Sequence, residues 1–150
     1  MTTHRFVPPA YHNVLGTLPP ALRIASGDSV VTETIDASGH DRDGIRRAPS
    51  PNPMNGPIHI DGAEPGDALR VDILRLTPVS DTGWTRAALA ANVLDPETAR
   101  TLPPRDSAIW LIDREALTTR LETPPPGLEH LVLPLAPMIG CFGVAPALGQ

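Results

Sequence analysis

The apolar residues of this 150-residue chain fall in short runs, separated by segments rich in proline, glycine and aspartate. Short runs of β-branched residues and leucine between turn-forming residues are typical of β-strands. Within 69–76, apolar and polar residues alternate from Leu69 to Ile73, which predicts a strand with one buried face. The pattern predicts strands over 22–25, 30–35, 58–60, 69–76, 109–112 and 131–133.

Turn and helix signals complete the pattern. Ser26-Gly27-Asp28 and Pro65-Gly66-Asp67 each combine a glycine, which tolerates positive φ, with an aspartate that bonds nearby backbone, so each predicts a turn into a strand. Helix starts are predicted at Asp95-Pro96-Glu97 and at 113–117, and the Ala-rich segment 85–92 is a third candidate. We therefore expect a mainly β fold: a β-sandwich-like domain of short strands, with Pro/Gly-rich turns and two or three short helices.

The C-terminal stretch 131–149 carries no charged residue and is about long enough to cross a bilayer as a helix. Pro134, Pro137 and Pro146 would break such a helix repeatedly. We therefore expect short buried strands here and no membrane contact. No linker separates parts of the sequence, so residues 1–150 are expected to form a single domain.

Composition excludes several classes of function. The net charge is −5, and the sequence lacks the clustered basic residues that nucleic-acid binding requires. All 12 basic residues are arginine, which excludes the lysine of phosphate-binding loops and Schiff-base chemistry. One cysteine excludes an internal disulfide, and no charged leader precedes an apolar segment, so we expect a cytoplasmic protein.

Ligand-type side chains are densest in a glycine-bearing loop after the strand predicted over 30–35. Asp36, His40, Asp41 and Asp43 lie there, and carboxylate oxygens with imidazole nitrogens suit zinc or another divalent cation. His12 is a further candidate ligand. The alternative interpretation is a solvated acidic turn, with His12 an ordinary hydrogen-bonded residue.

Two glutamates are candidate general bases. Glu33 lies in a predicted strand with apolar residues on both faces, so we expect its side chain to be enclosed, which favours a base that works near neutral pH. Glu64 is the second candidate, and the alternative for each is a surface or turn carboxylate. Cys141 has apolar sequence neighbours that favour an inert buried thiol over a nucleophile. His59 and His130 are interpreted as ordinary sheet residues.

Four segments together carry a family resemblance. The first joins Leu18-Pro19-Pro20, Ser26-Gly27-Asp28 and Glu33-Thr34-Ile35-Asp36. The second joins Asn52-Pro53-Met54-Asn55-Gly56-Pro57 to Gly62-Ala63-Glu64-Pro65-Gly66-Asp67. The third is Gly83-Trp84, and the fourth joins Leu133-Pro134-Leu135-Ala136-Pro137 to Gly143-Val144-Ala145-Pro146. In this order they resemble the acetamidase/formamidase family, which hydrolyses simple amides to the acid and ammonia.

The resemblance implies an all-β, usually oligomeric enzyme that is metal-assisted. Asp36 falls in the family's Glu-Thr-x-Asp stretch, Glu64 in its Gly-Ala-Glu-Pro-Gly-Asp stretch, and His12 near a family histidine. With Asp41 from the acidic loop, His12 and Asp36 become the expected ligands of a divalent metal, preferably zinc. Glu64 and Glu33 become the expected catalytic carboxylates. The metal would polarise the amide carbonyl and activate a water, whose proton a carboxylate would take.

The sequence departs from the family in two places. Relatives often carry an aromatic residue, and sometimes a histidine, in the stretch 14–18, which here is apolar. Relatives also continue into a His-Gly-Gly-Asn-Met-Asp motif, so the chain resembles the N-terminal half of such an enzyme.

Three functions stay open, one of them a metal-binding β-sandwich that hydrolyses some other substrate. The leading hypothesis is hydrolysis of a small amide substrate. The alternative is a non-catalytic β-domain, or a subunit that completes its site with a C-terminal partner chain. The uncharged stretch 131–149 would then be an exposed apolar patch, so we expect a homo-oligomer or binding of that partner chain.

Overall fold

The computed structural model describes residues 1–86, 94–101, 107–140 and 142–146. Strands dominate its regular structure, which confirms the mainly β fold expected from the sequence. The chain divides into two compact units: residues 1–79 with the C-terminal part from Met138, and residues 80–137. The single domain and the sandwich-like arrangement of its sheets stay predictions.

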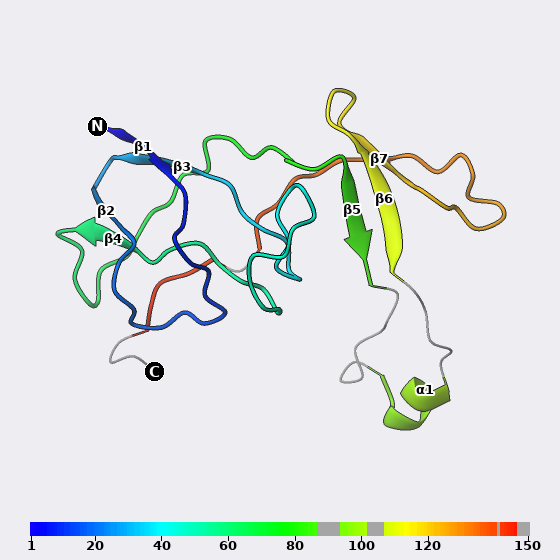
Figure 1. Ribbon diagram of the computed structural model, residues 1–150, viewed down its shortest axis with the longest axis horizontal. Helices are drawn as coiled ribbons and strands as arrows, with labels where there is room; N and C mark the ends of the chain where they lie inside the picture. Colours follow the sequence, from blue (N-terminus) through cyan, green and yellow to red (C-terminus); the bar gives the residue numbers. More distant parts are fainter. Residues whose placement is uncertain (87–93, 102–106, 141, 147–150) are drawn as a thin grey trace. The chain divides into compact units, whose positions relative to one another are not determined.

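The first unit contains two pairs of parallel strands (Figure 1). β1 (Thr3–Phe6) pairs with β3 (Ser29–Thr32), and β2 (Leu22–Ala25) pairs with β4 (Ile58–Asp61). Parallel neighbours need a long crossover, so the loops between these strands carry much of the unit's chain. Those loops include the acidic segment that follows β3.

The second unit is built on an antiparallel sheet of strand order β5-β6-β7-β8. Its strands are β5 (Thr82–Thr85), β6 (Ala108–Asp113), β7 (Thr118–Leu121) and β8 (Leu133–Pro134). The helix α1 (Pro96–Thr101) belongs to the connection between β5 and β6 (Figure 1). The sheet is thus a meander in which each strand pairs with its neighbour in sequence.

The strand predictions are only partly correct. β2, β4 and β6 lie where they were expected, whereas β3 stops at Thr32 and β8 begins two residues later than predicted. The strand predicted over 69–76 is wrong: this segment makes no ladder within the described part of the chain. Alternation marks a face that can be buried, but a strand also needs a hydrogen-bonded neighbour.

One helix start is confirmed and one is wrong. The Asp95 carboxylate accepts the backbone N–H groups of Glu97 and Thr98 and caps α1 as expected. Asp113 accepts the N–H groups of Glu115 and Ala116 in the same way, yet the chain turns back into β7. The same aspartate cap can begin either a turn or a helix. A third helix was predicted over 85–92. Thr85 belongs to β5 instead, and residues 87–93 lie outside the described residues.

Little of the described chain is fully buried. Phe6 and Ala48 are the buried hydrophobic residues there, while Val71 is 57 % exposed and Leu74 is 79 % exposed. None of the helical segments that the structure describes has the length and apolar character needed to cross a membrane. The apolar side chains of 69–76 are therefore exposed in this structure.

Candidate functional site

The acidic loop after β3 is two copies of one turn. In each copy the Oδ1 atom of an aspartate accepts N–H groups two and four residues later: Asp36 from Ser38 and His40, Asp41 from Asp43 and Ile45. The aspartate N–H also donates to the carbonyl four residues on, and its carbonyl accepts from the glycine three residues on. Both glycines have positive φ, 90° at Gly39 and 73° at Gly44.

The two turns are fixed to the segment at 47–48. The carbonyl oxygen of Gly39 accepts the N–H groups of Arg47 and Ala48, at 2.7 and 3.3 Å. Arg47 Nε donates to Asp41 Oδ2 at 2.6 Å, and this bond lowers the pKa of Asp41, helped by the backbone N–H of Ile45. The same contact raises the pKa of Arg47. The carboxylate of Asp41 is therefore engaged within the loop.

The three predicted metal ligands do not form an ion site in this structure. His12 pairs through its backbone with Met54, at 3.1 and 2.9 Å, while Asp36 and Asp41 organise their turns. Across the ranges that the structure describes, no group of three or more His, Cys, Asp or Glu side chains could hold a metal. The turn interpretation accounts for what the two aspartates do, and we derive no step through a metal.

Glu33 is not enclosed, contrary to expectation. β3 ends before it, its side chain is 41 % exposed, and both carboxylate oxygens accept hydrogen bonds from Arg42 in the second turn. The strand pattern misled because it extended β3 over 33–35. Its proposed role as a base therefore lacks the burial on which it depended.

Asn55 is a residue whose importance the sequence did not indicate. Its Nδ2 donates to Thr32 Oγ1 at 2.8 Å and to the Glu33 carbonyl at 2.9 Å, and so joins the turn-rich segment 52–57 to the end of β3. Its Oδ1 is buried and accepts no hydrogen bond within the described chain. The pair Asn55-Gly56 is typical of a tight turn, and nothing local distinguishes a turn residue from one that joins two segments.

Glu64 lies in the turn that leaves β4. Its N–H donates to Asp67 Oδ2 at 2.9 Å and its carbonyl accepts from the Asp67 N–H at 3.0 Å, while its exposed carboxylate has no partner among the residues described. No side chain of the described residues therefore engages this carboxylate. Cys141 lies outside the described residues.

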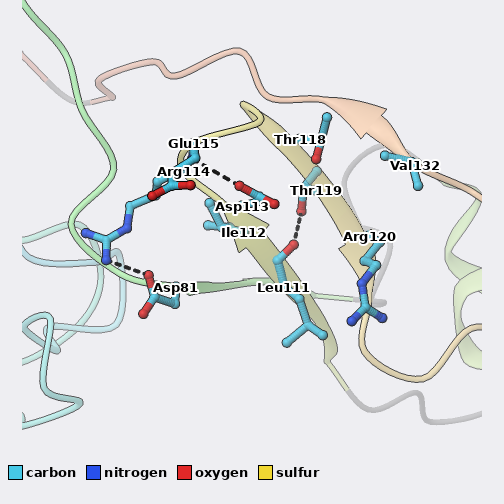
Figure 2. Close-up of a pocket in the computed structure, with 10 residues that line it drawn as sticks. All are labelled: Asp81, Leu111, Ile112, Asp113, Arg114, Glu115, Thr118, Thr119, Arg120 and Val132. Carbon is cyan, nitrogen blue, oxygen red and sulfur yellow. Dashed lines mark hydrogen bonds and ion pairs between the residues drawn. The ribbon is translucent and has the colours of Figure 1, made fainter.

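Each unit carries a pocket. The larger, about 510 Å³, lies on the sheet of the second unit (Figure 2). Arg114 reaches towards Asp81, with Nη2 2.7 Å from Oδ1, while Arg120 lies apart from this pair. The smaller pocket, about 170 Å³, belongs to the first unit and includes His59. Neither is lined by any of the five predicted site residues His12, Glu33, Asp36, Asp41 and Glu64.

Comparison with known proteins gives a consistent assignment. The model of the acetamidase/formamidase family matches residues 9–149. An acetamidase of Mycolicibacterium smegmatis is 33 % identical over 102 residues, which is 63 % of this chain and 24 % of the relative. The matched stretch thus spans about a quarter of that relative's length. No solved structure shows a significant match.

Proposed function

The chain belongs to the acetamidase/formamidase family, and on that premise we propose that it serves in the hydrolysis of a simple linear amide to the carboxylic acid and ammonia. The observation that carries the proposal is the family match from residue 9 to residue 149. The Mycolicibacterium smegmatis relative is an acetamidase, which supports an amide as the substrate.

The reaction requires a group that accepts a proton from the attacking water. We assign this role to Glu64, because its carboxylate is exposed and not engaged by the described residues. Glu33 is the weaker candidate, since Arg42 occupies both of its oxygens. A positioned carboxylate base typically contributes 10²–10⁴-fold to rate.

Release of ammonia from formamide and acetamide by the purified chain tests the proposal. Glu64→Gln is expected to reduce the rate by about 10²-fold or more, because glutamine cannot accept the proton. Glu97→Gln makes the same chemical change at an exposed position of α1, in the second unit, and should leave the rate unchanged. Equal rates for the two variants would remove Glu64 from the mechanism.

Metal dependence stays a prediction that the same assay addresses. Zinc is added in one arm and a chelator in another. Ammonia release that a chelator abolishes would support a metal, held by a set of residues other than the three predicted ligands. Release that is insensitive to both would overturn the metal prediction.

A second candidate function is a non-catalytic β-domain, or a subunit that binds a partner chain to complete the site. The exposed apolar side chains of 69–76 favour it, because exposed apolar side chains that lie close together in the chain can mark a contact surface. A chain that releases no ammonia alone, but does so when mixed with the remainder of a family enzyme, would establish this function.

A further inference from the structure

The segment 67–80 follows β4 and leads into β5 without a turn, helix or strand of its own (Figure 1). Every residue from 67 to 77 is exposed, and the apolar Val71, Ile73 and Leu74 are each more than half exposed. None of the backbone N–H and C=O groups of 69–76 makes a hydrogen bond to backbone within the described part of the chain. An exposed stretch with unpaired backbone groups is a template to which another strand can add.

The sequence of this segment is symmetric about Val71, except that the charges reverse sign. In an antiparallel pair of identical strands, a residue before the centre lies opposite the residue at the same distance after the centre. With Val71 at the centre, every charged residue meets one of opposite sign and every apolar residue meets another apolar residue. The opposed residues are Asp67 and Arg75, Ala68 and Leu74, Leu69 and Ile73, Arg70 and Asp72, and Val71 with its own copy.

Other registers lose this match. A pair centred on Arg70 or on Asp72 would place that charge opposite its own copy, which destabilises a sheet. A pair centred on Ile73 would place Asp72 opposite Leu74 and Arg70 opposite Leu76. A parallel pair in register would place every charge opposite its own kind. Because register follows from which side chains fit opposite each other, the sequence favours the pair centred on Val71.

Arg70 and Asp72 are available for contacts with a second copy. Within the chain, Arg70 Nε donates to Asp72 Oδ1 at 3.0 Å, and the two side chains are 86 % and 60 % exposed. An exposed ion pair of this kind contributes little to stability, so each side chain can exchange its partner for the same group of another copy at small cost. The bond also shows that these two side chains reach the same side, as residues two apart do in a strand.

We propose that residues 67–75 form an antiparallel strand pair with the same residues of a second copy of this chain, centred on Val71. Each strand then satisfies backbone N–H and C=O groups of the other, and the two contacts between Arg70 and Asp72 fix the register. The interface is two-fold symmetric, so this contact closes at two chains. The inference is separate from amide hydrolysis, and its tests measure no activity.

Thiol cross-linking of the full chain tests the register. Cys141, the one native cysteine, is first replaced by serine, and either Val71→Cys or Leu74→Cys is then added. Two copies of position 71 would lie directly opposite each other, with Cβ atoms about 4.5–5.5 Å apart. Two copies of position 74 would each lie opposite Ala68 and about 20 Å from each other, at roughly 3.4 Å per residue. A short bifunctional thiol reagent should therefore yield dimer about tenfold faster, or more, with Val71→Cys than with Leu74→Cys.

Charge reversal distinguishes contacts between copies from contacts within one chain. Arg70→Asp leaves two acidic residues beside Val71, and Asp72→Arg leaves two basic ones, so each variant alone opposes like charges. Each should dimerise about tenfold more weakly, or worse, in sedimentation experiments. Mixed in equal amounts, the two variants should form a heterodimer with about the affinity of the wild-type pair, because every contact between the unlike copies again joins opposite charges.

The outcomes separate this pairing from other modes of association. Equal cross-linking at the two cysteines would show association without the register and would overturn the proposal. A mixture of the charge variants that stays monomeric while the wild type dimerises would overturn it as well. If the wild type is a monomer and neither cysteine cross-links, the occupant of this segment is not a second copy, and the proposal fails. Circular dichroism of each variant, which should match the wild type at these exposed positions, excludes misfolding as the cause.

Discussion

Gly39 and Gly44 occupy equivalent places in the two turns of the acidic loop, but only one of them faces backbone. A Cβ atom built at Gly39 would lie 2.1 Å from the carbonyl oxygen of Ala48, whereas one at Gly44 would meet nothing within 4 Å. Gly39→Ala should therefore lower the free energy of unfolding by about 3 kcal/mol or more, from the clash and the positive φ together.

Gly44→Ala is the matched control for that substitution. It should lower the free energy of unfolding by about 1–2 kcal/mol, because positive φ is its one source of strain. Urea unfolding followed by circular dichroism measures both variants. Equal losses of unfolding free energy in the two variants would mean that the Ala48 carbonyl does not pack against Gly39 in solution.

The lowered pKa of Asp28 predicts that the protein loses stability in acid. Its hydrogen bond with His4, and then those from the Thr2 and Ala25 N–H groups, lower its pKa from 3.8 to about 2. Between these values the unfolded chain binds the proton and the folded chain does not, so acidification favours unfolding. The stabilisation is present above about pH 4 and is lost as the pH falls towards about 2.

The urea midpoint measured against pH shows whether Asp28 is responsible. Asp28→Asn should flatten the decline between about pH 4 and pH 2. Asp67 closes a turn of the same form, accepting one backbone N–H with no histidine beside it, so Asp67→Asn should leave most of the decline in place. A decline that persists in Asp28→Asn would assign it to other carboxylates.

Leu117 is held in a left-handed conformation, with φ of 52°, at the end of the β6–β7 turn. Its side chain is 53 % exposed, so little packing is lost when it is removed. Leu117→Gly should raise the free energy of unfolding of the second unit by about 0.5–1 kcal/mol, the relief of strain less the entropy of glycine. Trp84 and Trp110 provide the fluorescence signal, and Leu117→Ala, which keeps the strain, should change stability by less than about 0.5 kcal/mol.

The exposed apolar side chains of 69–76 predict self-association of the isolated chain. Val71, Ile73 and Leu74 are each more than half exposed. Light scattering should show species larger than one chain, and Val71→Glu with Leu74→Glu should shift them to the monomer. Val7→Glu, at a position that is 86 % exposed outside this segment, should not shift them. A monodisperse wild-type monomer would contradict the prediction.

Sequence predicted well those features that depend on adjacent residues. The turns at Asp28 and Asp67 form as expected because each needs only one glycine and one aspartate, although only the turn at Asp28 leads into a strand. The Asp95 cap forms for a similar reason. The same local chemistry misled at Asp113, where the pairing of β7 with β6 decides between helix and hairpin. Local signals specify how a segment begins but do not specify where it ends.

Features that depend on distant residues were not predictable in this way. β1 and β7 are rich in Thr, His and Arg, so no apolar pattern marks them. His59 lies in β4 as interpreted, but its neighbour Arg23 follows only from the register of β2 with β4. Asp36 and Asp41 were recognised as unusual, but sequence alone did not choose between metal ligands and turn formers.

The division of the chain also sets an order of assembly. The second unit comes from one contiguous stretch, whereas the first needs residues on both sides of it. Local contacts close faster than distant ones, and a chain emerging from the ribosome folds the part already released. The β5–β8 meander can therefore fold before the segment from Met138 onward is available to the first unit. Until then the β1–β3 and β2–β4 pairs lack part of their unit, so misfolding is expected mainly at these two strand pairs.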